Sequence, residues 1–180
     1  MAYLPYADLD STDLQPLVQR IVAERGSVLH LYQMLLHSPP PAEGWLGFMT
    51  QVRHKLELGG DLRELVIMRI AHLNGASYEA DQHAPIALRE GLTPAQLDAL
   101  PAWADAVDVY SPMQQNVLRL CDAMTRDVHV PPPLVEAVRA QLGDRQLVEL
   151  VGTIAAYNMV SRFLEALQIH GDDPRPAAGS

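Results

Sequence analysis

The sequence is poor in cysteine: Cys121 is the single thiol among 180 residues. One cysteine excludes an intrachain disulfide, a Cys-x-x-Cys redox pair and a zinc site built from several cysteines. Basic residues are also few, since 13 Lys and Arg stand against 22 Asp and Glu, a formal charge of -9. Because this charge opposes binding to a phosphate backbone, we do not expect nucleic acid as a partner.

Long apolar runs are missing as well. No stretch approaches the ~20 uninterrupted apolar residues of a membrane span, and the first ten residues lack the basic and apolar regions of a secretory signal. We therefore expect a cytoplasmic protein without a membrane partner. With 48% hydrophobic and 19% charged residues, the chain has enough material for one domain with a sizeable core, but not for two ordinary domains.

The pattern of apolar residues predicts an all-α fold, because no segment has a convincing period-two strand pattern and no Asn-Gly or Asp-Gly hairpin occurs. Pro39-Pro40-Pro41 is expected to end the second helix. Thr93-Pro-Ala-Gln96 and Ser111-Pro-Met-Gln114 are typical of helix starts with a capping box. Helices are expected at about 12–24, 27–38, 42–57, 61–74, 78–90, from 94, from 112, from 131 to 143, and at 145–169. We expect one domain over 1–170, an irregular connection at 101–112 and a disordered tail at 171–180.

A group of polar residues is expected to meet where two predicted helices turn at Gly75. Glu79 and His83 are four residues apart, so they share one helix face. Glu64 lies 11 residues before Gly75 and His83 lies 8 after it. If the helices are antiparallel, these positions differ by only about 5 Å along the axis. Two carboxylates and an imidazole are therefore expected to converge on largely apolar ground.

This combination is suited to proton transfer, because burial raises carboxylate pKa values and histidine titrates near neutrality. Each residue also has a structural explanation. Glu64 stands three residues after Asp61, the spacing at which a glutamate side chain folds back on the cap of its own helix. Glu79 sits in a first helical turn, where a carboxylate interacts favourably with the helix dipole. His83 alone is typical of a hydrogen-bonded core histidine. Only the expected convergence favours a functional site, to which Tyr78 would add a phenol donor.

Other candidates are weaker. Glu79 and His83 alone fall short of a metal site, so we expect no metal. Cys121 lies among apolar residues of one helix, which favours an inert core thiol over a nucleophile. Arg63 and Arg69 are candidates to meet an anionic substrate, although solvated or interfacial arginines are commoner.

The run Arg63-Glu64-Leu-Val-Ile-Met-Arg-Ile-Ala-His-Leu-Asn-Gly-Ala76-Ser-Tyr78-Glu79-x-x-x-His83 resembles the signature of the carboxymuconolactone decarboxylase and AhpD-like alkylhydroperoxidase superfamily. The resemblance extends from the Leu31-Tyr32 and His37-Ser38-Pro39 region to Tyr157-Asn158 and Phe163-Leu164. It implies a single AhpD-like helical domain of about eight to nine helices with a central antiparallel helix pair. It also implies a homo-oligomer, trimeric or hexameric with a dimer as the alternative.

In AhpD-like peroxidases a glutamate, two cysteines and a histidine relay protons and activate thiols. The resemblance places that glutamate at Glu64 and that histidine at His83, whereas the cysteine positions hold Ala76 and Glu79. Peroxidase chemistry at these positions is therefore not expected. The decarboxylases resemble this chain in their Glu-x-x-x-His spacing, which Glu79 and His83 reproduce, but Tyr78 replaces the histidine that precedes it.

These observations predict an acid-base enzyme without a cofactor, a lyase, decarboxylase or isomerase acting on a small carbonyl-bearing or lactone-like molecule. His83 is expected to be the general acid or base, Glu79 its partner, Glu64 the orienting residue and Tyr78 a donor to oxyanion charge. Met68, Ala76 and Asn158 are expected to line the substrate pocket. Two alternatives remain open: a thiol-dependent alkylhydroperoxidase using Cys121, and a non-catalytic helical ligand-binding or scaffold protein.

Overall fold

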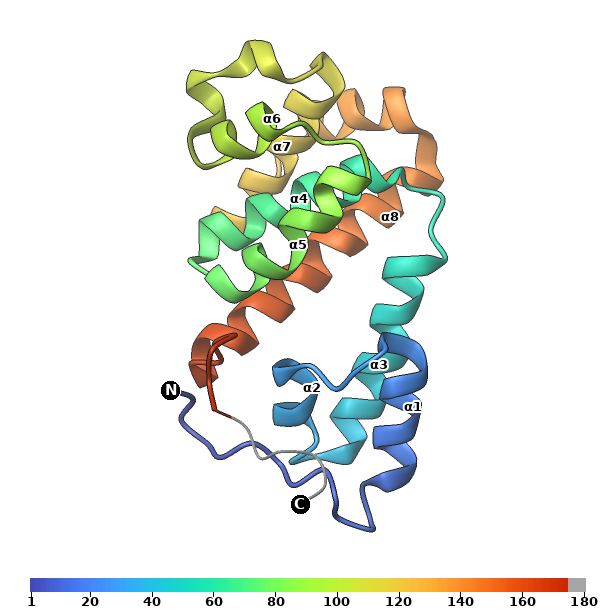
Figure 1. Cartoon of the computed structure of the whole chain (residues 1–180). Helices are drawn as coiled ribbons and strands as arrows, with labels where there is room; N and C mark the ends of the chain where they lie inside the picture. Colours follow the sequence, from blue (N-terminus) through green and yellow to red (C-terminus); the bar gives the residue numbers. More distant parts are fainter. Residues whose placement is uncertain (175–180) are drawn as a thin grey trace. The chain divides into compact units, whose positions relative to one another are not determined.

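The computed structural model describes residues 1–174, and within that range all regular secondary structure is helical (Figure 1). The all-α prediction is therefore confirmed. Eight α-helices and two 3₁₀ helices are present among the described residues: α1 (Gln15–Arg25), α2 (His30–Leu35), α3 (Pro39–His54), α4 (Gly60–Asn74), α5 (Ser77–Arg89), α6 (Pro94–Ala99), η1 (Leu100–Asp105), η2 (Val107–Val109), α7 (Pro112–Arg126) and α8 (Pro132–Leu167).

The chain divides into two compact units, each of which is described separately. The first unit contains Met1–Lys55 and residues 164–174, and the second contains Leu56–Phe163. A single domain over 1–170 stays a prediction. The predicted disordered tail lies outside the described residues from position 175 onward.

In the first unit, α3 packs against both α1 and α2 (Figure 1). Its core includes Ile21, Leu36, Ala42 and Leu46, which are almost fully buried. The proline run does not merely separate two helices, as the sequence predicted: Pro39–Pro41 form the first turn of α3. Proline is tolerated there because the first turn has no intrahelical acceptors for its N–H groups, and the fixed φ of proline suits a helix.

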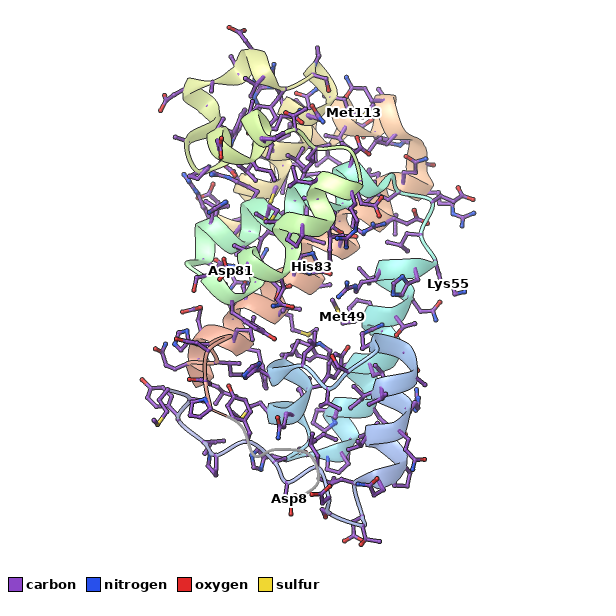
Figure 2. The ribbon with its side chains drawn as sticks, in the orientation of Figure 1. Asp8, Met49, Lys55, Asp81, His83 and Met113 are labelled. Atoms are coloured by element: carbon purple, nitrogen blue, oxygen red, sulfur yellow. The ribbon has the colours of Figure 1, made fainter. Side chains whose placement is uncertain are left out.

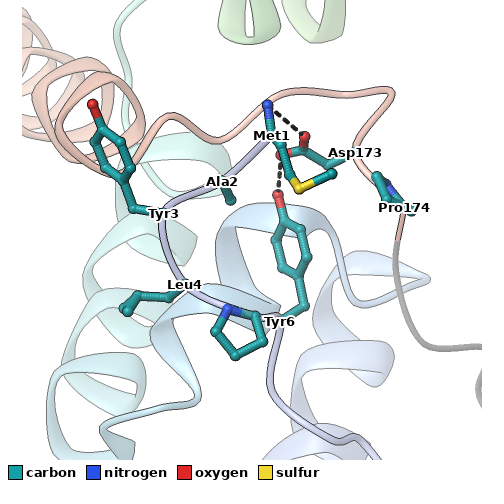
Figure 3. Close-up of a pocket in the computed structure, with 8 residues that line it drawn as sticks. Met1, Ala2, Tyr3, Leu4, Tyr6, Asp173 and Pro174 are labelled. Atoms are coloured by element: carbon teal, nitrogen blue, oxygen red, sulfur yellow. Dashed lines mark hydrogen bonds and ion pairs between the residues drawn. The ribbon is translucent and has the colours of Figure 1, made fainter.

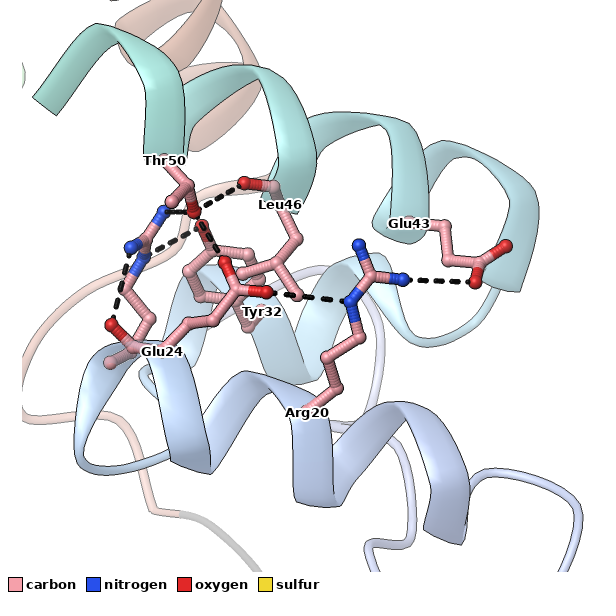
Figure 4. Close-up of polar contacts among 7 residues, drawn as sticks. Arg20, Glu24, Tyr32, Glu43, Leu46 and Thr50 are labelled. Carbon is pink, nitrogen blue, oxygen red and sulfur yellow. Dashed lines mark hydrogen bonds and ion pairs between the residues drawn. The ribbon is translucent and has the colours of Figure 1, made fainter. Parts of the chain in front are cut away.

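A polar cluster joins α1 to α2 and α3 in this unit (Figure 4). The Arg25 guanidinium donates to the Tyr32 hydroxyl at 3.2 Å and to Thr50 Oγ1 at 2.8 Å. Thr50 in turn donates to Glu24, and this hydrogen bond holds the pKa of Glu24 below its ordinary value. Every charged group in this cluster has a partner from another helix, which fits a structural role.

The described end of the chain is also held in the first unit. Asp173 is buried and accepts hydrogen bonds from the Tyr6 hydroxyl at 2.7 Å and the His170 backbone N–H at 3.0 Å. Burial raises the pKa of Asp173, but these hydrogen bonds outweigh it and the pKa lies below its ordinary value. Together with Met1–Tyr6, Asp173 and Pro174 line a cavity of about 340 Å³ (Figure 3). None of the predicted site residues lies in this lining.

The second unit is built around α4. Apolar residues on all sides of this helix are at most 4% exposed, namely Leu65, Val66, Ile67, Met68, Ile70 and Ala71. The helix packs against α5 and α7. Gly75 ends it in the left-handed conformation, with φ of 71°, and α5 begins two residues later. The predicted antiparallel pair is therefore present, and its tight turn brings the two helices side by side.

Both predicted capping boxes are present. Thr93 and Gln96 at α6, and Ser111 and Gln114 at α7, satisfy each other's backbone N–H groups. The start of α5 has no side-chain cap, because the residue before its first residue, Ser77, is Ala76. The connection expected to be irregular at 101–112 contains η1 and η2, so much of it is short helical turn.

The helix α8 (Pro132–Leu167) spans both segments that were predicted to be helical, 131–143 and 145–169. Gly143, with φ of 76° and ψ of 172°, interrupts it at the position where the sequence placed a helix end. Among the described residues, α8 is also the helix whose length and mean hydropathy of 1.2 would suffice to cross a membrane, but half of that window is buried inside the protein. Such burial is typical of the core helix of a soluble helical domain.

Candidate active site

The helices α4 and α5 bring Glu64, Glu79 and His83 into direct contact. Nδ1 of His83 lies 2.6 Å from Glu64 Oε2, and Nε2 of the same ring lies 3.2 Å from Glu79 Oε1. Each ring nitrogen therefore faces its own carboxylate. Figure 2 labels His83 on α5 in the second unit. The convergence expected from the turn at Gly75 is found, while the catalytic roles of the three residues stay predictions.

All three side chains are removed from water: Glu64 is 2% exposed, Glu79 6% and His83 3%. Burial lowers the pKa of His83, but the hydrogen bonds and negative charges of Glu64 and Glu79 outweigh it, so the pKa lies above its ordinary value. Burial raises the pKa of Glu64, but the contacts with His83 and Arg63 outweigh it, so this pKa lies below its ordinary value. Both directions favour an imidazolium beside an ionised Glu64.

The alternative that Glu64 caps its own helix is wrong. The start of α4 has no side-chain cap, and both oxygens of Glu64 are used elsewhere. Oε2 contacts His83, and Oε1 accepts from Nε of Arg63 at 3.1 Å. The capping spacing is common at helix starts, and only the packing of α5 against α4 offered Glu64 a better partner.

An aromatic residue that sequence reasoning did not assign to the site completes the surroundings of His83. Tyr157 on α8 packs its ring edge-on against the imidazole, with centroids 5.2 Å apart and an angle of 89°. In the sequence, Tyr157 stood out only as part of the family resemblance, and no local spacing linked it to His83. Tyr78 is buried in the first turn of α5, next to Glu79, and its role as a donor stays a prediction.

The predicted pocket residues occupy different environments. Met68 is buried in α4, and Ala76 is fully buried immediately before α5. Asn158 is held by three helices: its Nδ2 donates to Thr125 Oγ1 and to the Ile154 carbonyl, and its Oδ1 accepts from Asn74. These contacts give Asn158 a role in helix packing, and its place in a pocket stays a prediction.

Arg69 is not available to an anionic substrate. It is 3% exposed, and its guanidinium donates to both oxygens of Asp122 at 2.6 and 2.8 Å. It also donates to the carbonyls of Leu100 and Pro101. Arg69 therefore joins α4 to α7 and η1, which is a structural role.

A cavity of about 480 Å³ lies in the second unit, lined by the starts of α4 and α7 and by residues on both sides of Gly143. Its lining includes Glu57, Asp61, Gln114 and Gln146, but none of the three cluster residues. Across the described residues, no group of three or more His, Cys, Asp or Glu side chains has the arrangement of a metal site.

Cys121 lies in the core of the second unit and is fully buried. Burial raises the pKa of its thiol far above the ordinary value, so almost no thiolate forms at neutral pH. We expect a thiol-reactive disulfide reagent to label Cys121 at least about 100-fold more slowly in the folded protein than in guanidinium chloride. The measurement is the absorbance of the released aromatic thiolate. Native labelling at the rate of an exposed thiol would contradict the burial.

The fold and the cluster define an all-helical protein of the AhpD-like type with a buried carboxylate–imidazole–carboxylate group. Similar folds occur in an uncharacterized peroxidase-related protein with an alkylhydroperoxidase AhpD core from Ralstonia eutropha JMP134 (TM-score 0.80, 18% identity, 96% of this chain and 93% of that one). The debrominase Bmp8, crystallised with 2,3,4-tribromopyrrole, is also similar (TM-score 0.74, 15% identity, 96% and 94%). At these identities the likeness shows the fold alone.

The sequence comparisons identify the family. The profile of the carboxymuconolactone decarboxylase family matches residues 39–123, which contain Glu64, Glu79 and His83. The uncharacterized protein YdfG of Bacillus subtilis (strain 168) is 32% identical over 107 residues, which cover 58% of this chain and 72% of that protein. The chain belongs to the carboxymuconolactone decarboxylase family.

Proposed function

We propose that this protein is an acid-base enzyme that moves protons on a small organic substrate, as a lyase, decarboxylase or isomerase acting on a carbonyl-bearing or lactone-like molecule. One observation carries the proposal: a buried imidazole has a carboxylate on each of its nitrogens, at 2.6 and 3.2 Å. A histidine held this way accepts or donates a proton without leaving its position.

The two carboxylates have different roles in this proposal. Glu64 accepts the Nδ1 proton of His83 through the shorter contact, which leaves Nε2 as the nitrogen that gains and loses a proton. The proton near Nε2 is shared with Glu79 Oε1 across 3.2 Å. Because each ring nitrogen of His83 already contacts a carboxylate, a substrate either contacts Glu79 directly or displaces the Glu79 carboxylate from Nε2. Glu79 and His83 are therefore the catalytic residues, and Glu64 orients the ring.

The proposed step is redox-neutral. In an isomerisation the pair takes a proton from a carbon next to a carbonyl and returns it to another carbon. In a decarboxylation CO₂ leaves and the pair protonates the carbanion that remains. Negative charge develops on the substrate oxygen in both cases, and a buried donor such as the Tyr78 hydroxyl would stabilise it. No added cofactor is needed for either step.

A thiol-dependent peroxidase is disfavoured by the side chains present. The positions that match the redox cysteines hold Ala76 and Glu79, and Cys121 is buried on a different helix, α7. The similarity of the fold to a debrominase bound to a bromopyrrole supports a small ring compound as the class of ligand, without implying the same reaction.

A solvent-exchange screen tests the proposal. Wild-type protein in D₂O is incubated with small lactones, β-keto acids and ketones, and deuterium incorporation and CO₂ release are followed by NMR. We expect at least one compound to be converted, and Glu79→Gln to lower the rate at least about 100-fold, because the amide cannot exchange a proton. Glu43→Gln, which changes an exposed glutamate of the first unit, serves as the control.

The burial of the cluster favours a second interpretation, a non-catalytic helical ligand-binding or scaffold protein. Glu64, Glu79 and His83 are at most 6% exposed, and neither cavity described above includes them. The same screen distinguishes the two functions. Undiminished conversion by Glu79→Gln would contradict the acid-base mechanism, and absence of conversion by the wild type would support the non-catalytic role.

We also propose that the protein works in the cytoplasm as a homo-oligomer, trimeric or hexameric with a dimer as the alternative. Support comes from the family and from apolar side chains on the outside of the second unit's helices, among them Val148 at 70% and Met159 at 39% exposure. Sedimentation at micromolar concentration tests the assembly, and a monomeric mass would contradict it.

A further inference from the structure

We propose that Arg63 and Glu90 are positioning residues of this site: their ion pair holds Glu64 ionised and in place against Nδ1 of His83. The inference rests on the proposed function, because it explains how one carboxylate of the cluster stays fixed while the other exchanges a proton. It assigns a role to two residues that lie outside the contacts of His83 itself.

The contacts form a chain from the surface to the imidazole. Nη2 of Arg63 lies 3.2 Å from Glu90 Oε1, and Nε of Arg63 lies 3.1 Å from Glu64 Oε1. The other oxygen of Glu64 contacts His83. The side chain of Glu90 is 40% exposed, that of Arg63 13% and that of Glu64 3%. Both oxygens of Glu64 are thus engaged by separate nitrogen donors, whereas Glu79 contacts Nε2 of His83 through Oε1.

The glycine at position 60 makes room for this ion pair. A Cβ at Gly60 would lie 1.7 Å from Glu90 Oε2 and 2.4 Å from its Cδ. Gly60 is the first residue of α4, and Glu90 follows the last residue of α5. The two residues therefore lie at the end of the helix pair that is opposite the turn at Gly75. A methyl group at position 60 would therefore require the Glu90 carboxylate to move from its present position.

Arginine stays protonated at all relevant pH values, so Arg63 cannot pass a proton from Glu90 to Glu64. Its role is to stabilise the ionised form of Glu64 and to fix its rotamer. Among the described residues, His83 also contacts Glu79 on α5 and the Tyr157 ring on α8. With Glu64 held by Arg63, proton exchange is directed to Nε2 and Glu79.

The test follows the Nδ1 proton of His83 by ¹H and ¹⁵N NMR during acid titration, without substrate. This proton is protected while it is bonded to an ionised Glu64 and exchanges rapidly once Glu64 takes up a proton. We expect Arg63→Gln to raise the pH of that loss by about one unit, a tenfold change in proton binding. Arg20→Gln, which removes an exposed arginine of the first unit, is the control.

Glu90→Gln and Gly60→Ala separate positioning from simple charge. If Glu90 holds Arg63 in place, Glu90→Gln and Gly60→Ala each raise the pH at which the Nδ1 proton loses its protection, by less than Arg63→Gln does. The double variant Arg63→Gln with Glu90→Gln raises that pH no further than Arg63→Gln alone. If only through-space charge mattered, Glu90→Gln would shift the loss downward, because a nearby negative charge is removed. The proposal is overturned if Glu90→Gln lowers the pH of the loss, or if neither Glu90→Gln nor Arg63→Gln changes it. These results do not depend on turnover, so they are separate from failure of the proposed function.

Discussion

Replacing His83 by Gln is expected to lower kcat on the substrate found by the exchange screen by about 10²- to 10⁴-fold, the usual contribution of a general acid or base. Glutamine fills a similar volume and can still donate a hydrogen bond to Glu64, so the helix pair should persist. It cannot accept or release a proton at neutral pH. The measurements are kcat by NMR and the helical content by circular dichroism.

His72→Gln is the matched control for this variant. His72 lies on α4, is exposed, and carries the same side chain outside the cluster. We expect no loss of kcat in His72→Gln. If His83→Gln retains the activity of His72→Gln while both are folded, the cluster is structural and the acid-base mechanism is wrong.

The largest expected effect on stability comes from Asp122→Ala. Asp122 accepts two hydrogen bonds from Arg69 and one from Trp103 Nε1 at 3.2 Å. Removing the carboxylate leaves the Arg69 charge, which is 3% exposed, without its counter-ion. Breaking one side of a buried pair costs about 3–5 kcal/mol, and the side chain of Asp122 is 21% exposed, so we expect about 3 kcal/mol. The measurement is chemical denaturation followed by circular dichroism.

Glu43→Ala is the control for this loss, because it breaks an ion pair with Arg20 in which both side chains are largely exposed. Such pairs contribute little. Asp122→Asn should lie between the two, since it keeps hydrogen bonding and loses the charge. An unfolding free energy of Asp122→Ala equal to that of Glu43→Ala would show that the Arg69 pair does not hold α4 to α7.

Local sequence signals predicted the helices and several of their ends well. Thr93 with Gln96 and Ser111 with Gln114 form the expected capping boxes, and Gly75 and Gly143 lie where helices end or break. These signals work because they depend on backbone groups within one turn. The proline run was placed in the wrong role, because a proline-rich segment can either end one helix or begin the next.

The site was predictable only where two helices share a short turn. Gly75 restricts α4 and α5 to antiparallel packing, so helical rise alone predicted that Glu64 and His83 would meet. The same reasoning could not predict the contact with Tyr157, which lies on α8, 74 residues after His83 in the sequence. Nor could it distinguish Arg63 from Arg69, although one contacts Glu64 and the other contacts Asp122.

The sequence by itself determined the helical class, the loss of thiol chemistry at Ala76 and Glu79, and the presence of Glu64, Glu79 and His83 at spacings that allow contact. Composition and local periodicity are sufficient for the helical class and for the spacings, whereas the positions of the missing thiols follow from the family resemblance. Only the tertiary structure decided that each nitrogen of His83 faces its own carboxylate and that Arg63 links Glu64 to Glu90. The reason is physical: the partner of a buried charge is selected by the packing of helices, which local spacing does not encode.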